Sequence, residues 1–161
     1  MIDQETVAPA AQTFRLRTAL LKAGRTTRFI ASTEADGHAM SVAIKCYAEG
    51  GENEFHTHAH EDHMFVVLQG RAVFQEPAQP DRELGRNEGI LIPAGAFYKF
   101  EAASDEPLVL LRVGNTYVPV EGSAETAQAE DRLGVTGAAL PSRSAENKHV
   151  TGVPIEGAFF E

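Results

Sequence analysis

The stretch GENEFHTHAHEDHMFVVLQG, residues 51–70, holds four of the six histidines of the chain, at positions 56, 58, 60 and 63. Glycine begins and ends it, and its second half is a run of aliphatic and aromatic residues that is typical of a buried strand. Histidine is the commonest metal ligand in proteins, but it is also common on surfaces. The spacing of these side chains must therefore decide between a metal site and a polar hairpin tip.

The segments on either side of this stretch have the pattern of short β-strands. Runs rich in β-branched and aromatic residues are separated by glycine, proline, asparagine and aspartate; they lie at residues 38–48, 54–58, 63–70, 71–76, 90–93, 97–102 and 107–114. Such spacing predicts an all-β sandwich or barrel rather than βαβ units. We divide the chain into an N-terminal extension (1–37), a β-barrel (38–118) and a C-terminal extension (119–161).

The two extensions carry weaker signals. Residues 14–24, FRLRTALLKAG, fit either a short helix that ends at Gly24 or a strand. Residues 123–134 are rich in alanine and glutamate and predict one or two helical turns. The chain ends in AFFE, and a disordered tail has little use for an aromatic pair. We expect the C-terminal extension to dock on the barrel or on a neighbouring subunit.

Charge and composition narrow the possible partners. The 161 residues carry a formal net charge of −9, which argues against a nucleic-acid partner. No run is apolar over the length needed to cross a bilayer, and the N-terminus lacks the pattern of a secretory signal. Cys46 is the single cysteine, so no disulfide forms within the chain. We expect a cytoplasmic protein without a membrane partner.

The histidine spacing favours a metal site. Alternate residues of a strand share a face, so His56 and His58 point the same way. His63 opens the following strand and can return beside them. Three imidazoles that converge from one side leave coordination positions open for water or substrate, as catalytic metal sites require. The sequence thus predicts a divalent metal ion on His56, His58 and His63.

The turn between the two strands carries further polar side chains. His60 lies in this turn, and we expect it to be solvated or to support a ligand rather than to bind the metal. We interpret Glu61 and Asp62 as turn residues, although either can accept a hydrogen bond from a ligand imidazole. A polar hairpin tip with exposed histidines is the alternative to a metal site.

The opening stretch resembles the first sequence motif of the cupin superfamily, which runs glycine, a spacer, His-x-His, three or four residues, glutamate, six residues, glycine. His56 and His58 match the histidine pair, and Gly70 matches the closing glycine. IPAGAFY, residues 92–98, resembles the end of the second motif, Pro-x-Gly-x-x-His. The resemblance covers roughly residues 38–114 and implies a jelly-roll barrel, the double-stranded β-helix of cupins.

Two positions depart from the cupin pattern. His63 stands where the family usually has a metal-binding glutamate, and Tyr98 stands in place of the last histidine. Three neutral ligands leave a divalent ion its full charge, so we expect an anionic or chelating small-molecule substrate. We expect Tyr98 to hydrogen-bond bound water or substrate as a catalytic residue. Ligation as a phenolate and a place in the barrel wall are the alternatives.

The resemblance does not imply one reaction, because cupins include dioxygenases, isomerases, lyases, epimerases and binding proteins. By analogy with cupins that have three-histidine sites, we expect an Fe²⁺-dependent dioxygenase. An isomerase, cyclase or lyase that uses its metal as a Lewis acid is one alternative, and a non-catalytic binding protein is another. Zn, Mn, Ni or Cu can replace iron in these readings. The resemblance also implies a homodimer or higher oligomer.

Charged and aromatic residues in the strands complete the expectations. Lys45 and Arg112 interrupt apolar strands, and we interpret them as outward-facing charges, with a substrate-carboxylate clamp as the alternative. Cys46 has the opposite parity to Lys45 and is expected to be a small buried hydrophobe. The core or pocket wall is expected to contain Met40, Met64, Phe65, Phe74, Phe97 and Phe100.

Overall fold

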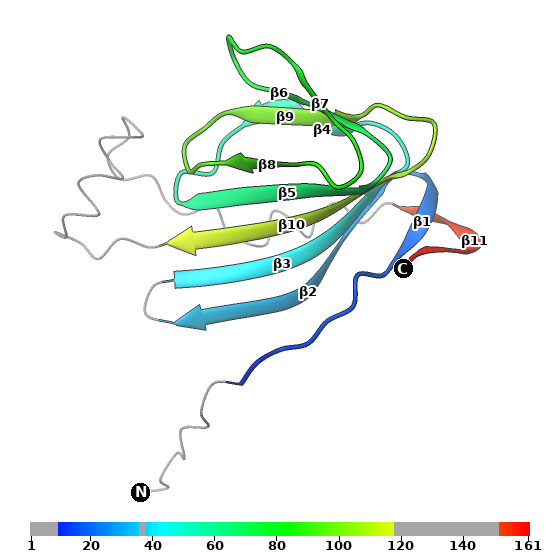
Figure 1. The fold of residues 1–161 in the computed structure, drawn as a ribbon, viewed down its shortest axis with the longest axis horizontal. Coiled ribbons are helices and arrows are strands. Elements are labelled where there is room, and N and C mark those ends of the chain that lie inside the picture. Colours follow the sequence, from blue (N-terminus) through cyan, green and yellow to red (C-terminus); the bar gives the residue numbers. More distant parts are fainter. Residues whose placement is uncertain (1–9, 36–37, 118–151) are drawn as a thin grey trace, which may run out of the picture.

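The computed structural model describes residues 10–35, 38–117 and 152–161, which form strands and no helix (Figure 1). The expected helical turns at 123–134 lie outside these ranges. No helix in the described ranges is long and apolar enough to span a membrane. In chain order the strands are β1 (Thr18–Ala23), β2 (Arg25–Ala35), β3 (His38–Tyr47), β4 (Gly51–His56), β5 (Glu61–Gln69), β6 (Ala72–Gln75), β7 (Arg82–Leu84), β8 (Gly89–Ile92), β9 (Tyr98–Ala102), β10 (Leu108–Tyr117) and β11 (Val153–Phe160).

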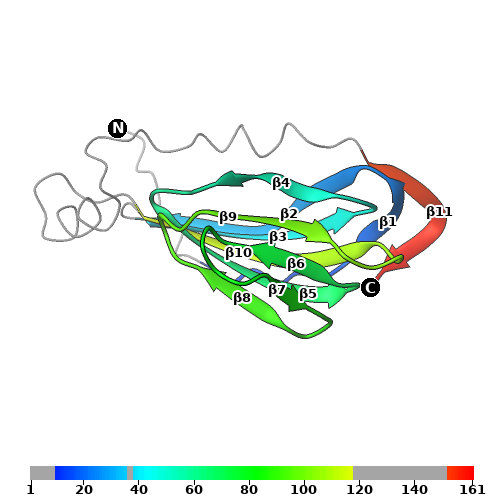
Figure 2. The ribbon, with the colours of Figure 1, turned by 90° about the horizontal axis from the view of Figure 1, so that it is seen from above.

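Two antiparallel sheets enclose the interior of the barrel. The larger has the strand order β2-β3-β10-β5-β8, and the smaller has the order β4-β9-β6-β7. Seen from above, β4, β9 and β6 lie over β3, β10 and β5 (Figure 2). This is the all-β jelly-roll arrangement that the sequence predicts. Strand β2, which lies within residues 1–37, is an edge strand of the larger sheet and pairs with β3.

Aromatic side chains from both sheets fill the barrel interior. The rings of Phe65, Phe74 and Phe100 pack with centroid separations of 5.0 to 5.5 Å. Tilted and edge contacts of this kind add to the burial energy of the rings. Aliphatic side chains from β5, β8 and β10 surround them, so the expected core positions at 65, 74 and 100 are confirmed; the buried aliphatic members are Val67, Ile90, Ile92, Leu108 and Leu110.

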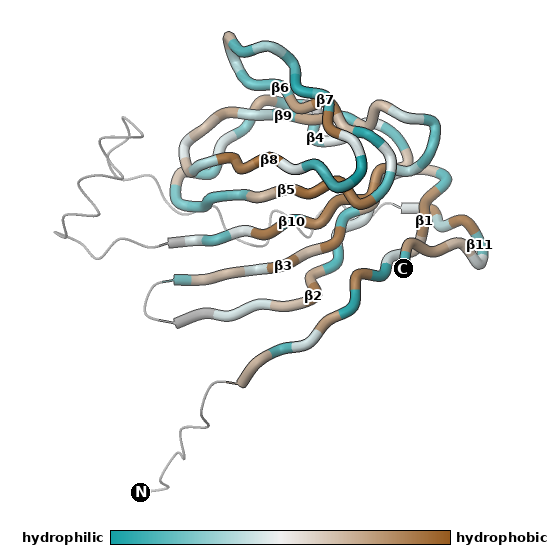
Figure 3. Tube along the Cα trace, viewed as in Figure 1, coloured by the Kyte–Doolittle hydropathy of each residue, from teal (hydrophilic) through white to brown (hydrophobic). Residues whose placement is uncertain are grey.

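A second apolar cluster lies on the outer face of the larger sheet. Leu21, Ile44, Cys46 and Val109 are buried there, and Phe160 packs against them. Strand β1 pairs with β11, with Thr18 opposite Phe160, and the two strands lie side by side over this end of the sheet (Figure 1). Residues 18–23 are therefore a strand and not a helix. In Figure 3 the brown, apolar parts of β3 and β10 lie toward this same end.

The burial of several residues differs from expectation. Lys45 and Arg112 are 6% and 1% exposed and lie inside the barrel, so the outward orientation expected for them is wrong. Side chains that lie opposite each other in an antiparallel pair point to the same face of the sheet. Strands β3 and β10 carry apolar residues on both faces, because β1 and β11 cover the outer face of the sheet. Met40, Met64 and Phe97 are exposed and do not belong to the core.

The register between β4 and β9 depends on a close backbone approach at Gly51. A Cβ atom placed on Gly51 would collide with the backbone carbonyl of Phe100. We therefore expect Gly51→Ala to lower the free energy of unfolding by about 2–3 kcal/mol, as over-packing of a rigid site does. Gly85→Ala is the matched control, since its Cβ would meet only Glu88 Oε2 at 3.6 Å. Urea unfolding of both variants measures the difference, and equal stability would contradict the close approach.

Candidate metal centre

The start of β5 brings two potential ligands into the barrel. Glu61 and His63 occupy alternate positions of the strand, so both side chains face the interior. His58 follows the end of β4 at His56 and joins them from the connecting segment. The same-strand argument for His56 and His58 therefore does not apply, because β4 ends before His58.

His58, Glu61 and His63 form a compact donor group. One ligand atom from each lies within 4.8 Å of the others. His63 Nε2 is 3.1 Å and His58 Nδ1 is 3.8 Å from Glu61 Oε2. Neighbouring ligands of a six-coordinate ion lie about 3 Å apart when each bond is about 2.1 Å. The donor types and their closeness suit a divalent metal ion, which would require His58 to move closer to Glu61.

The protonation states of this group suit metal binding. Burial raises the pKa of Glu61, but the bond to His63 and the charge of Arg112 outweigh it and lower the pKa to about 2. Burial and the neighbouring His63 lower the pKa of His58 to about 4. At neutral pH Glu61 is thus an ionised carboxylate and His58 a neutral imidazole. These are the forms in which the two side chains bind metals.

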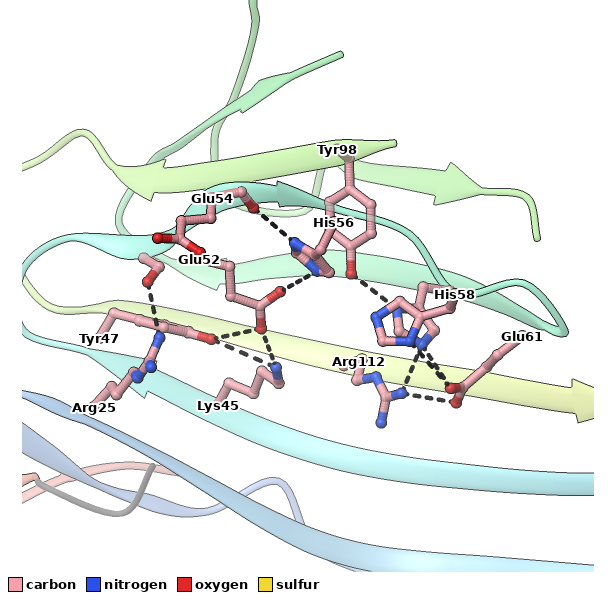
Figure 4. A network of polar contacts seen from close by, with 12 residues as sticks. Arg25, Lys45, Tyr47, Glu52, Glu54, His56, His58, Glu61, Tyr98 and Arg112 are labelled. Atoms are coloured by element: carbon pink, nitrogen blue, oxygen red, sulfur yellow. Dashed lines mark hydrogen bonds and ion pairs between the residues drawn. The ribbon is translucent and has the colours of Figure 1, made fainter. Parts of the chain in front are cut away.

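His56 lies beside the donor group but uses its nitrogens elsewhere. Its ring centroid is 5.3 Å from that of His58. Nδ1 is 2.9 Å from the carbonyl oxygen of Glu54, and Nε2 is 3.1 Å from Glu52 Oε2 (Figure 4). Burial lowers the pKa of His56, but the bonds to Glu52 and Glu54 raise it more, so the net pKa lies above the ordinary value. Both ring nitrogens face oxygen acceptors, so in this arrangement neither directs a lone pair at the donor group.

Tyr98 acts on His63. Its hydroxyl oxygen is 2.9 Å from His63 Nδ1, and its side chain is buried. The ring of Tyr98 also packs against that of His56, with 4.4 Å between centroids. Because Nδ1 is engaged by Tyr98, the other nitrogen of His63 points toward Glu61. A hydrogen bond of this kind fixes the orientation of a ligand histidine.

The turn that carries the Pro-x-Gly motif is fastened to the histidine segment. The backbone N–H of Ala94 donates to Asp62 Oδ1 at 2.8 Å. The N–H of Gly95 donates to the carbonyl of His58 at 2.9 Å, and Gly95 has a positive φ of 84°, which suits glycine. The two motifs therefore position His58 together. His60 lies outside the donor group of the described residues.

Arg112 reaches the donor group from β10. Its Nη2 donates to Glu61 Oε1 at 2.7 Å and lies 2.7 Å from His63 Nε2. Gly114 makes this contact possible, because a Cβ atom there would collide with Glu61 Oε1 and lie 2.9 Å from Arg112 Nη2. From the sequence, Glu61 was considered only as a turn residue that could accept a hydrogen bond from a ligand imidazole, and Arg112 only as an outward-facing charge or a substrate clamp; the meeting of the two side chains was not predicted. The signal was present in the parity of Glu61, which matches that of His63.

A second charged group lies next to the first. Lys45 Nζ donates to Glu52 Oε1 at 2.6 Å, and Tyr47 Oη donates to the same atom at 3.2 Å (Figure 4). Burial raises the pKa of Glu52, but Lys45 and His56 outweigh it and hold the net pKa well below its ordinary range. Burial and the neighbouring Glu52 raise the pKa of Tyr47 well above its ordinary value. This group was not predicted from the sequence, because Lys45 was expected to face outward.

The Lys45–Glu52 pair makes stability depend on pH. A carboxyl group whose pKa is depressed by folding stabilises the protein above its unfolded-state pKa, about 4.3, and this contribution is lost as the pH falls through the folded-state value. We expect Glu52→Gln to cost roughly 3 kcal/mol at pH 7 and clearly less at pH 3. Urea unfolding at both pH values tests this. Glu83→Gln, which removes an exposed partner of Arg71, is the control with little effect at pH 7. A cost of Glu52→Gln that does not change with pH would contradict it.

Comparison with known proteins identifies the fold. Residues 43–114 match the family model of the cupin domain. A putative mannose-6-phosphate isomerase from Ralstonia eutropha JMP134 is 13% identical, with a TM-score of 0.54 over 68% of this chain and 100% of its own. A cupin superfamily protein from Desulfitobacterium hafniense DCB-2 is 17% identical, with a TM-score of 0.47 over 59% of this chain and 78% of its own. A cupin-2 domain containing protein from Shewanella frigidimarina NCIMB 400 is 24% identical, with a TM-score of 0.41 over 55% of this chain and 78% of its own.

No curated protein sequence matches the chain. At 13% identity the Ralstonia structure shows a shared fold and not a shared reaction. Three observations indicate the same fold. They are the two facing antiparallel sheets, the His-x-His and Pro-x-Gly segments, and the family match over residues 43–114. Residues 43–114 of this chain form a cupin domain.

Proposed function

We propose that the protein is a metal-dependent enzyme that acts on a small organic anion inside the barrel. The observation that supports this most strongly is the convergence of His58, Glu61 and His63, whose ligand atoms lie within 4.8 Å of one another. Two of them are the histidines expected as ligands, and Glu61 supplies a carboxylate in place of the glutamate that this chain lacks at position 63. In this proposal His56 supports the site through its contacts with the neighbouring rings.

The charge of the site defines the class of substrate. A divalent ion on one ionised carboxylate retains a net positive charge, and the guanidinium of Arg112 adds to it. Lys45 is compensated by Glu52, with 2.6 Å between Nζ and Oε1. The uncompensated charge inside a low-dielectric barrel favours an anionic ligand. We propose a small carboxylate or another anion that can also chelate a metal.

The donor set favours oxygen chemistry. Two histidines and one carboxylate with open positions are the ligands typical of non-haem Fe²⁺ oxygenases. Bound iron would supply the site at which substrate and O₂ meet, which is the contribution that we propose for a dioxygenase. The protein's own part is to hold His63 through Tyr98, to keep Glu61 ionised and to line the interior with Phe65 and other apolar side chains that exclude water.

One observation favours a second candidate. Arg112 contacts both Glu61 and His63, and a guanidinium in that position can bind an organic anion without any metal. Under this reading the protein is a non-catalytic module for a small anionic ligand. A Lewis-acid isomerase, cyclase or lyase would use the same metal ligands as the dioxygenase but would not need O₂.

Bound metal in a set of variants tests the proposed ligands. We expect His58→Ala, His63→Ala and Glu61→Gln each to weaken metal binding by at least about 100-fold, because each removes a bond to the ion. His60→Ala is the matched control and should change the affinity by less than roughly threefold, a change too small for a lost ligand. Elemental analysis of dialysed protein measures the metal content per chain.

His56→Ala decides how many ligands there are. A loss as large as that of His58→Ala would place His56 in the coordination shell and would contradict the role assigned to its bonds with Glu52 and Glu54. Full metal content in both His58→Ala and His63→Ala would overturn the metal site itself.

Dependence on oxygen tests the reaction. We expect the Fe²⁺-loaded protein to consume O₂ only when a suitable substrate from a panel of chelating carboxylates, diketones and catechols is present. An oxygen electrode measures the uptake, with Glu61→Gln as the inactive control. Turnover that proceeds equally well without O₂ would replace the dioxygenase with the Lewis-acid alternative. Tight binding of panel members by metal-depleted protein, without turnover, would favour the binding module.

A further inference from the structure

Arg112 occupies the side of His63 that a metal ion would use. Its Nη2 lies 2.7 Å from His63 Nε2, and the guanidinium is 1% exposed. Nε2 also lies 3.1 Å from Glu61 Oε2, so the guanidinium and the carboxylate both lie next to the ring nitrogen that a metal would use. The other ring nitrogen, Nδ1, faces the Tyr98 hydroxyl at 2.9 Å.

A metal ion cannot share this position with Arg112. Nε2 of a neutral imidazole has one lone pair, which either accepts a hydrogen bond from Arg112 or binds a metal. The same guanidinium nitrogen also donates to Glu61 Oε1, so it contacts two of the three donor residues. Two cations held by the same two side chains would also repel each other in a buried site.

We infer that Arg112 is a placeholder cation that the metal must displace. The inference rests on the proposed metal function and concerns the same donor group. Arg112 neutralises Glu61 and occupies the position beside His63 Nε2 that the metal would take. The free energy needed to move Arg112 away makes the free energy of metal binding less favourable. Arg112 therefore influences the metal affinity as a positioning residue and not as a ligand.

Displacement also explains how metal and substrate can depend on each other. Arg112 lies on β10, where a Cβ at Gly114 would collide with Glu61, so the guanidinium is closely enclosed and remains in the interior after it leaves His63. A buried guanidinium requires an anionic partner. The anionic group of the substrate can take the place that Glu61 leaves, so the anion binds more tightly once the metal is present.

Binding of Co²⁺ alone, measured by isothermal titration calorimetry, tests the placeholder. We expect Arg112→Met to bind Co²⁺ at least about 10-fold more tightly than the wild type, a change of the size that neighbouring residues have on metal sites. Lys45→Met is the matched control. It removes the other buried cation of the interior, whose carboxylate partner is Glu52, and should change the affinity by less than roughly threefold, well below a tenfold effect.

Thermal unfolding separates displacement from a merely structural role. Without metal, Arg112→Met should melt below the wild type, because Glu61 loses its buried partner. With saturating Co²⁺ the two should melt at nearly the same temperature, because the metal compensates Glu61 in both proteins. The deficit of Lys45→Met should be the same with and without Co²⁺. Arg112→Gln, which keeps a polar side chain without the charge, serves if Arg112→Met does not fold.

The outcomes distinguish this inference from the proposed function. Wild-type binding of Co²⁺ with equal or weaker binding by Arg112→Met, or a stability deficit that Co²⁺ leaves unchanged, overturns the placeholder and leaves the metal function standing. Binding by Arg112→Met but not by the wild type supports the placeholder and overturns a resident metal. Failure of both proteins to bind Co²⁺ overturns both.

Discussion

The interior of this barrel is organised by the need to compensate two buried cations. Lys45 and Arg112 lie on adjacent strands of the larger sheet and face inward, where an unpaired charge is very unfavourable. Each cation holds a carboxylate, Glu52 or Glu61, and each carboxylate contacts a histidine. These two pairs orient the histidines and keep the carboxylates ionised. The Arg112–Glu61 pair also requires the space that Gly114 leaves on β10.

The two charged pairs bear on the two positions, 63 and 98, at which this sequence differs from the cupin pattern. Position 63 lacks the usual glutamate, but Glu61 places a carboxylate on the same side of β5, because alternate residues of the strand face the interior. A phenol stands at position 98 in place of the family's histidine, and its hydroxyl lies 2.9 Å from His63 Nδ1. In the proposed site the donors therefore lie toward the start of β5, and His56 contacts Glu52.

The fold could be predicted from the sequence because strand spacing and turn residues are local signals. Asn87 has a φ of 68°, a left-handed turn conformation that asparagine tolerates. The orientation of Lys45 and Arg112 could not be read in the same way. Strands β3 and β10 are apolar on both faces because β1 and β11 cover the outer face, so neither face stands out as exposed. Glu61 was hidden by its place in the apparent turn, where a solvated carboxylate is the ordinary expectation.

The most direct test of the metal centre is a crystal structure of the protein grown with Mn²⁺ and measured at a wavelength at which manganese scatters anomalously. We expect a single anomalous peak bonded to His58 Nδ1, to Glu61 and to His63 Nε2, with Arg112 moved away from His63. Both ring nitrogens of His56 should retain their contacts with Glu52 and Glu54. A peak at another place, or no peak while Arg112 keeps its 2.7 Å contact with His63, would contradict the metal centre described above.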